Sequence, residues 1–219
     1  MLESKEFDSW VHGNERILWC IGAPGTGKTV LASAVVSTLE TTVASSEVAT
    51  AYLYCTHAER NNQTIEEMFG SLIQQLLWQR PVPNDTLNLY NSHKDFGTRP
   101  SLAELSAQLE ILTSLFSKVY IVIDALDECP ELNNTRRSLI AQLRKLNSQV
   151  RLLFTSRPLG ILEDLKDAAR FSIVSPEDDM RKYISTQIQQ EPRLLALCQK
   201  HAGLEVEILN QIIAKADGM

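Results

Sequence analysis

Five short apolar runs recur along the chain, each bounded by polar or turn-forming residues. They are rich in β-branched and aromatic side chains, a composition typical of strands. Apolar residues follow one another within each run with little polar alternation, which indicates strands buried on both faces of a sheet. The predicted strands span residues 17–21, 50–55, 119–123, 151–155 and 171–174.

Between these runs, apolar residues recur every three or four positions, which predicts amphipathic helices. The third of these segments opens on Ser101 with Glu104 three residues later, the pattern of a capping box. Strands that alternate with helices of this length predict right-handed crossovers, and therefore an α/β fold with a parallel sheet covered on both faces. The predicted helices span 28–40, 64–79, 101–116 and 135–147.

Two regions depart from this alternation. Segment 80–100 carries three prolines and many polar residues, so we predict a long surface connection there. After residue 174 the pattern changes to three consecutive helices, and the last has an apolar residue at every fourth position from Leu204 to Ala216. We therefore predict an α/β core over 1–175 and, over 176–219, the start of a helical subdomain that this sequence truncates. The three helices are predicted over 175–190, 192–203 and 204–218.

Composition narrows the classes of function. The 219 residues carry a net charge of −6 and no basic run, which argues against a nucleic-acid or anionic-membrane partner. No apolar run approaches the ~20 residues needed to span a bilayer, and the first residues lack the layout of a secretion signal, so a soluble, cytoplasmic protein is predicted. The four cysteines form no C-x-x-C pair and the four histidines have no metal-ligand spacing, which predicts reduced thiols and no zinc site.

The stretch GAPGTGKT at 22–29 fits the pattern G-x-x-x-x-G-K-[ST]; it follows a predicted strand and opens a predicted helix. Glycines let the backbone turn its N–H groups inward, and the N-terminus of the following helix attracts the same anion. Lys28 is predicted to reach the β- and γ-phosphates of a nucleotide, and the Thr29 hydroxyl to hold Mg²⁺. The alternative is a glycine-rich turn with an exposed lysine. The predicted phosphate-binding set is Gly22, Ala23, Pro24, Gly25, Thr26, Gly27, Lys28, Thr29 and Val30.

A second constellation, VYIVIDALDECP, occupies 119–130. An apolar strand delivers Asp124 at its C-terminal end, the edge where ligands bind in open α/β sheets. There the carboxylate can orient Mg²⁺ opposite Thr29. Asp127 and Glu128 follow, and a carboxylate at such a position can orient or deprotonate a water molecule aimed at the γ-phosphate. The alternative is that this acidic pair only caps the next helix.

A third stretch, RLLFTSRP at 151–158, ends a predicted buried strand in polar residues. Arg157 is predicted to contact the γ-phosphate through charge-assisted hydrogen bonds. The alternative is an exposed arginine in the turn that Pro158 marks.

Together, GAPGTGKT, IVIDALDEC and LLFTSRP resemble the motifs of NACHT-type signal-transduction NTPases of the STAND class. The resemblance is greatest to the nephrocystin-like N-terminal NTPase domain of fungal NLR-like and ankyrin-repeat proteins. It implies a P-loop NTPase fold with a five-stranded parallel sheet of order 5-1-4-3-2, followed by a short C-terminal helical extension. It also implies a nucleoside triphosphate and Mg²⁺ as ligands, with self-association gated by the nucleotide.

The resemblance favours a signalling switch that binds nucleotide and hydrolyses it slowly. Two alternatives stay open: a turnover enzyme, such as a kinase or an AAA-type ATPase, and a scaffold that binds nucleotide without hydrolysis. The sequence lacks an N-K-x-D guanine motif, which favours ATP, and GTP stays open.

Overall fold

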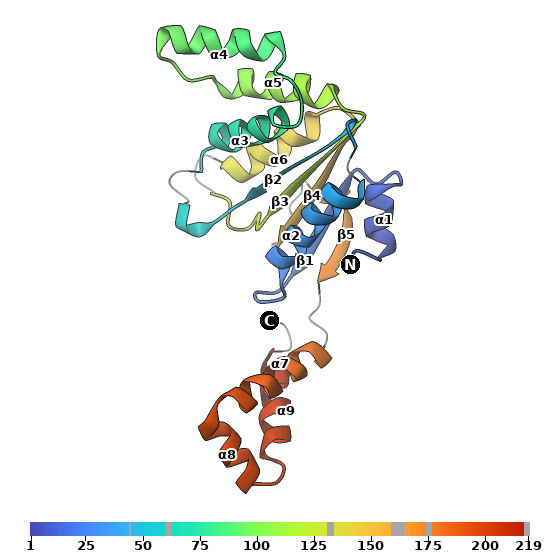
Figure 1. The fold of residues 1–219 in the computed structure, drawn as a ribbon, viewed down its shortest axis with the longest axis vertical. Coiled ribbons are helices and arrows are strands. Elements are labelled where there is room, and N and C mark those ends of the chain that lie inside the picture. Colours follow the sequence, from blue (N-terminus) through green and yellow to red (C-terminus); the bar gives the residue numbers. More distant parts are fainter. Residues whose placement is uncertain (44, 60–62, 131–133, 159–164, 174–176, 217–219) are drawn as a thin grey trace. The chain divides into compact units, whose positions relative to one another are not determined.

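The computed structural model describes residues 1–43, 45–59, 63–130, 134–158, 165–173 and 177–216. The chain divides into two compact units. The first comprises Met1–Gly22 and Lys28–Ser172, and the second comprises Ala23–Gly27 and Ile173–Met219. The first unit contains the central sheet and the helices that cover it (Figure 1).

A five-stranded sheet forms the centre of the first unit, and its strand order is β2-β3-β4-β1-β5. The pairs β2–β3, β3–β4 and β1–β4 are parallel. The predicted fold class and strand order are therefore confirmed. The strands are β1 (Ile17–Gly22), β2 (Val48–Tyr54), β3 (Lys118–Asp124), β4 (Val150–Ser156) and β5 (Ala169–Ile173).

The edge strand β5 departs from the prediction in one respect. Its residues alternate between half-buried and exposed, whereas two buried faces were predicted for every strand. The prediction was wrong here because an edge strand has a neighbour on one side only and is less completely covered. Position 174, the predicted last residue of this strand, lies outside the described residues.

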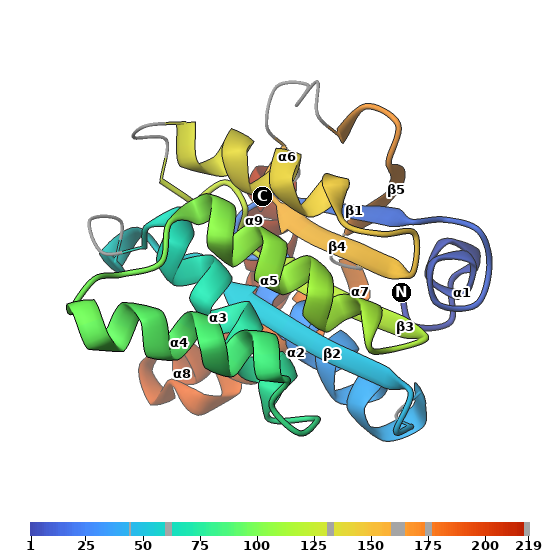
Figure 2. The same cartoon turned by 90° about the horizontal axis from the view of Figure 1, so that it is seen from above.

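Helices cover both faces of the sheet (Figures 1 and 2). One face packs against α3 (Ile65–Leu77), α5 (Leu102–Ser114) and α6 (Thr135–Lys145), in a core that includes Ile121 and Phe154. The other face packs against α1 (Lys5–Val11) and α2 (Lys28–Thr38). All four helices predicted between the strands are present, and the predicted capping box of Ser101 and Glu104 is formed.

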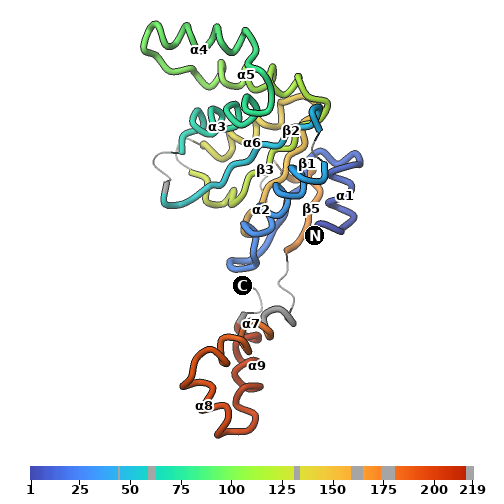
Figure 3. The backbone as a smooth tube through the Cα atoms, viewed as in Figure 1, coloured from blue at the N-terminus to red at the C-terminus, as the bar shows by residue number. Residues whose placement is uncertain are grey.

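Segment 80–100, predicted as a long surface connection, is mostly exposed, but it contains a helix that was not predicted, α4 (Asn84–Phe96). It lies along α5 (Figure 3) and docks through polar contacts, such as the 2.6 Å hydrogen bond from Gln108 Nε2 to Thr86 Oγ1. Thr86 is the one residue of α4 that is buried. The helix was missed because it has no apolar stripe. The glycine that ends it, Gly97, adopts a φ of 61°, the left-handed conformation that glycine favours.

The short helix α1, which the sequence pattern did not predict, is tied to the sheet by aromatic residues. Trp10 is fully buried, and its indole Nε1 donates a 2.9 Å hydrogen bond to the carbonyl of Leu152. Its ring meets the Tyr120 ring edge-on at 5.2 Å. The Tyr120 hydroxyl in turn donates to the carbonyl of Val11 over 2.9 Å. The segment before β1 is therefore part of the core.

Replacing Trp10 with alanine should destabilise the first unit by about 3–5 kcal/mol, because a large buried side chain and a buried hydrogen bond are both lost. Trp78→Ala is the matched control, since this tryptophan is 75% exposed; its effect should stay within about 0.5 kcal/mol. Urea unfolding followed by circular dichroism measures both. Equal effects of the two substitutions would contradict the anchoring role of α1.

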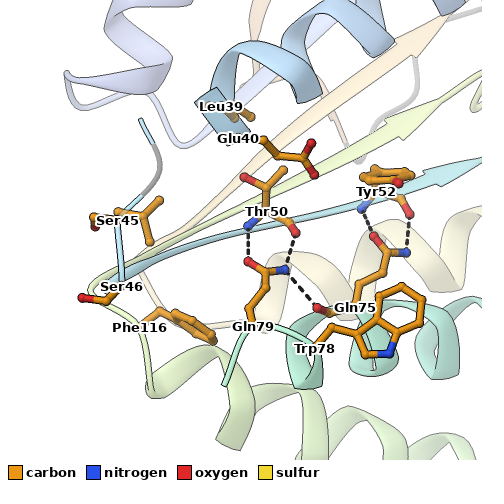
Figure 4. Close-up of a pocket in the computed structure, with 11 residues that line it drawn as sticks. Leu39, Glu40, Ser45, Ser46, Thr50, Tyr52, Gln75, Trp78, Gln79 and Phe116 are labelled. Carbon is orange, nitrogen blue, oxygen red and sulfur yellow. Dashed lines mark hydrogen bonds between the residues drawn. The ribbon is translucent and has the colours of Figure 1, made fainter. Parts of the chain in front are cut away.

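The outer edge of β2 is closed by glutamine side chains (Figure 4). The Gln79 amide pairs with the backbone of Thr50, accepting from its N–H over 3.2 Å and donating to its carbonyl over 2.8 Å. Gln75 does the same for Tyr52, with both distances at 2.9 Å. Gln75 lies on α3, and Gln79 follows four residues later in the turn after the helix, so the two side chains match alternate residues of the strand. They satisfy backbone groups that an edge strand otherwise presents to other chains.

Removing both amides, in a Gln75→Ala/Gln79→Ala variant, should lower the free energy of unfolding by about 1–3 kcal/mol per glutamine, because backbone groups lose their partners. The open edge should also promote self-association at high concentration. Gln74→Ala, an exposed position of the same helix, is the control. Chemical denaturation and light scattering test the two effects, and a variant as stable and monodisperse as this control would contradict the capping role.

In the second unit, the three predicted helices are present as α7 (Glu177–Gln190), α8 (Pro192–Lys200) and α9 (Leu204–Ala216) (Figure 3). Proline stands at the first position of α8, where its missing N–H is not needed. On α9, Leu209 is buried, while Ile212 of the predicted apolar stripe is 44% exposed. None of the helices in the described parts of the chain is long and apolar enough to cross a membrane.

Candidate nucleotide-binding site

The loop Ala23–Gly27 joins β1 to α2 and contains two residues in the left-handed region. Gly25 has a φ of 81° and Gly27 a φ of 82°. A Cβ atom added at either position would meet nothing within 4 Å, so backbone conformation, not space, requires glycine there. Thr26 closes the turn, because its N–H and its Oγ1 both donate to the carbonyl of Ala23, over 3.3 and 2.9 Å. The loop thus has a defined shape of its own.

Lys28 begins α2, and its ammonium donates a 2.9 Å hydrogen bond to the carbonyl of Gly22, the last residue of β1. Burial lowers the pKa of this lysine from its ordinary value, and the negative charges of Asp127, Asp124 and Glu128 act in the opposite direction. The Lys28 ammonium therefore lies in the field of all three predicted carboxylates. Thr29 and Val30 follow on the first turn of α2, and both are exposed.

Asp124 is the last residue of β3 and is almost fully buried. One of its carboxylate oxygens, Oδ1, accepts a 2.5 Å hydrogen bond from the hydroxyl of Thr155 on β4. The backbone then turns sharply, since Ala125 has a φ of 54° although it is not glycine. The Ala125 N–H donates to the same Thr155 hydroxyl over 2.9 Å. The position of Asp124 is thus fixed from the neighbouring strand.

The acidic pair that follows is bound to Arg157. Asp127 Oδ2 lies 3.1 Å from Arg157 Nε, and Asp127 Oδ1 accepts from the Arg157 backbone N–H over 3.0 Å. Glu128 Oε1 lies 3.5 Å from Arg157 Nη2, and its other oxygen accepts from the backbone N–H of His57 over 3.2 Å. The Asp127 side chain is 8% exposed and that of Glu128 is 28% exposed, so Glu128 is the more accessible carboxylate.

Two cysteines lie near this acidic pair. Cys55 and Cys129 are both buried and not bonded as a disulfide. A hydrogen bond between their thiols raises the pKa of Cys55, with burial acting in the same direction, and lowers the pKa of Cys129. Burial alone raises the pKa of a third thiol, Cys20 on β1, to about 12. All three thiols are buried, so we assign them to packing and not to chemistry.

The structure therefore brings together five of the predicted site residues at one end of the sheet: Lys28, Asp124, Asp127, Glu128 and Arg157. Two contacts were missed by sequence reasoning, the Thr155 hydroxyl on Asp124 and the His57 backbone N–H on Glu128. The first contact could have been found from the register of β3 and β4. Ile123 pairs with Phe154, so the next residues, Asp124 and Thr155, lie side by side at the ends of the two strands. A backbone donor such as that of His57 leaves no signal in side-chain identity.

The strand β1 leads through a glycine loop into a helix that begins with Lys28, and β3, two positions away in the same sheet, ends in Asp124. This arrangement defines a P-loop nucleotide-binding domain. The chain matches the family described as Nephrocystin 3, N-terminal over residues 1–157, and it belongs to that family. It is thus a NACHT-type NTPase domain.

Two further comparisons report similar proteins. The chain is 25% identical over 231 residues to the Vegetative incompatibility protein HET-E-1 of Podospora anserina, a match that covers all of this chain and 17% of that protein. Its fold is similar to the Aeropyrum pernix ORC1 protein in complex with DNA, with a TM-score of 0.53, 19% identity, and coverage of 89% of this chain and 51% of the other. The chain spans less than a fifth of the first protein and about half of the second. The likeness to ORC1 concerns the fold alone.

Proposed function

We propose that this domain binds a nucleoside triphosphate with Mg²⁺, hydrolyses it slowly, and uses the nucleotide to control self-association. One observation carries the proposal: the Lys28 ammonium, at the start of α2, lies within electrostatic reach of Asp124, Asp127, Glu128 and Arg157. Phosphoryl transfer needs a cation that contacts the phosphates and carboxylates that bind a metal ion and orient a water molecule. It also uses a second cation near the γ-phosphate.

The roles follow from position. The N–H groups of 22–30 hold the phosphates, and Lys28 exchanges the carbonyl of Gly22 for β- and γ-phosphate oxygens. The Thr29 hydroxyl and the Asp124 carboxylate supply oxygen atoms, which Mg²⁺ prefers. Among the residues that the structure describes, no three His, Cys, Asp or Glu side chains are grouped to hold a metal. The ion would therefore draw its other ligands from water and phosphate, and when bound it would neutralise phosphate charge.

We assign the orientation of the attacking water to Glu128, because it is the more exposed member of the acidic pair. Asp127 holds Arg157 through two contacts, which aims the guanidinium. Arg157 is half exposed and retains N–H groups for a γ-phosphate. Nucleotide binding without hydrolysis is the second candidate function. It is favoured by the fact that both Glu128 oxygens have donors in this structure.

Differential scanning fluorimetry with ATP, ADP and GTP, each with Mg²⁺, tests binding and the choice of base. A ligand at 100 times its dissociation constant should stabilise the domain by about 2.7 kcal/mol. We expect ATP to raise the melting temperature more than GTP does. Size-exclusion chromatography with light scattering should report a larger species with ATP than with ADP. If none of the three nucleotides changes the melting temperature, the proposal is wrong. If ATP binds and no phosphate is released, the second candidate function replaces it.

A further inference from the structure

The hydroxyl of Thr155 occupies a fully buried position between the ends of β3 and β4. It makes two hydrogen bonds of opposite sense. Its oxygen accepts from the Ala125 N–H over 2.9 Å, and its hydrogen is donated to Asp124 Oδ1 over 2.5 Å. A hydroxyl has one hydrogen and the amide can only donate, so the direction of this chain is fixed. Asp124 must accept at Oδ1.

The backbone of Thr155 supports the next turn as well. Its carbonyl accepts from the Leu126 N–H over 2.8 Å. These contacts hold Ala125 in the left-handed conformation, which an alanine rarely adopts. The turn then closes through the Glu128 N–H, which donates to the carbonyl of Ala125 over 2.7 Å. One residue of β4 thus fixes both the carboxylate at the end of β3 and the turn that carries the acidic pair.

We propose that Thr155 is a positioning residue for the magnesium site: its hydroxyl holds Oδ1 of Asp124, so that Oδ2 would be the carboxylate oxygen left to bind the cation or one of its water ligands. This inference rests on the proposed function. A hydrogen bond to a charged acceptor is short and directional, as this one is. Groups that hold a metal-binding carboxylate in this way determine metal affinity without touching the metal.

The test compares two variants of the chain. Thr155→Val keeps the shape of the side chain and removes the hydroxyl. Thr155→Ser keeps the hydroxyl and removes a methyl group. Binding of a fluorescent ATP analogue is titrated with Mg²⁺, and separately measured in EDTA. We expect Thr155→Val to raise the Mg²⁺ concentration at half-saturation by about 10- to 100-fold. The affinity for the ATP analogue measured in EDTA should change by less than about twofold. Thr155→Ser should have the same Mg²⁺ requirement as the unmodified chain.

Two outcomes overturn the inference alone. One is an unchanged Mg²⁺ requirement in Thr155→Val. The other is a Thr155→Ser variant as impaired as Thr155→Val, which would assign the effect to packing. If Thr155→Val does not fold, as judged by circular dichroism, Thr155→Ala takes its place, because it only removes atoms. In an Asp124→Asn background the threonine substitution should have no further effect on Mg²⁺, since the two residues act as one unit. If the unmodified chain binds no nucleotide at any Mg²⁺ concentration, the proposed function fails and this inference fails with it.

Discussion

Replacing Lys28 with alanine is expected to abolish the stabilisation that nucleotide gives the domain while leaving the fold intact. The Lys28 ammonium is partly buried beside the carbonyl of Gly22 and in the field of three carboxylates. A hydrogen bond to a charged group contributes about 1.5–3 kcal/mol, and in the proposed complex Lys28 would make such bonds to two phosphates. Affinity should therefore fall by about 100-fold or more, and the stabilisation of about 2.7 kcal/mol expected at saturation should disappear.

The fold should survive because the Lys28 side chain is only partly buried. We expect the melting temperature without ligand to change by no more than a few degrees, about 1 kcal/mol or less. Lys145→Ala, at an exposed position in the last turn of α6, is the matched control for loss of one positive charge. Isothermal titration calorimetry with ATP and Mg²⁺ compares the two. Equal affinities in Lys28→Ala and Lys145→Ala would mean that the loop does not bind phosphate through Lys28.

The sheet was predictable because its strands are apolar runs that need no neighbour to be recognised. Every strand lies within two residues of its predicted bounds. The strand order came from the resemblance of three motifs to a known family. Helix α4 could not be predicted from the hydrophobic pattern. It is held by contacts such as Gln108 to Thr86, and a helix without an apolar stripe has no periodicity to detect. Helix α1 was missed because a seven-residue segment is too short for that test.

The candidate site also has a part that the sequence predicts and a part that it does not. The places of Lys28 at the start of a helix and of Asp124 at the end of a strand were predictable, because each belongs to a local motif next to a strand. The partners of those residues come from distant segments and depend on register. Asp127 and Arg157 were each predicted to act on the nucleotide, yet the structure pairs them with each other. That pairing spans 30 residues, and only the adjacency of β3 and β4 brings the two together.

This pairing separates the roles of the two carboxylates. Both oxygens of Asp127 face Arg157, whereas the two oxygens of Glu128 are divided between Arg157 and the His57 N–H. Glu128 has the longer contact to Arg157, 3.5 Å, and the greater exposure. A water molecule can therefore reach Glu128 more readily than Asp127. In the proposed function, Glu128 is therefore the carboxylate assigned to accept the proton from water.

Glu128→Gln is therefore expected to lower the rate of hydrolysis by about 100-fold or more, because a general base contributes about 10²–10⁴ to such reactions. Nucleotide binding should remain, since the carboxamide oxygen can still accept from the His57 N–H. Single-turnover phosphate release measures the rate, and calorimetry measures the affinity. Glu110→Gln, at an exposed position of α5, is the control for loss of one negative charge.

Asp127→Asn is expected to change nucleotide preference, because Asp127 is assigned to hold Arg157 and not to orient water. The carboxamide loses the ion pair with Arg157, so the arginine is no longer held for the γ-phosphate. We expect a weaker preference for ATP over ADP in Asp127→Asn, measured by calorimetry with both nucleotides, whereas Glu128→Gln should keep that preference. If Glu128→Gln hydrolyses ATP as fast as the unmodified chain and Asp127→Asn does not, the two roles must be exchanged. The water would then be oriented by the buried carboxylate, and the ion pair with Arg157 would have to open during each turnover.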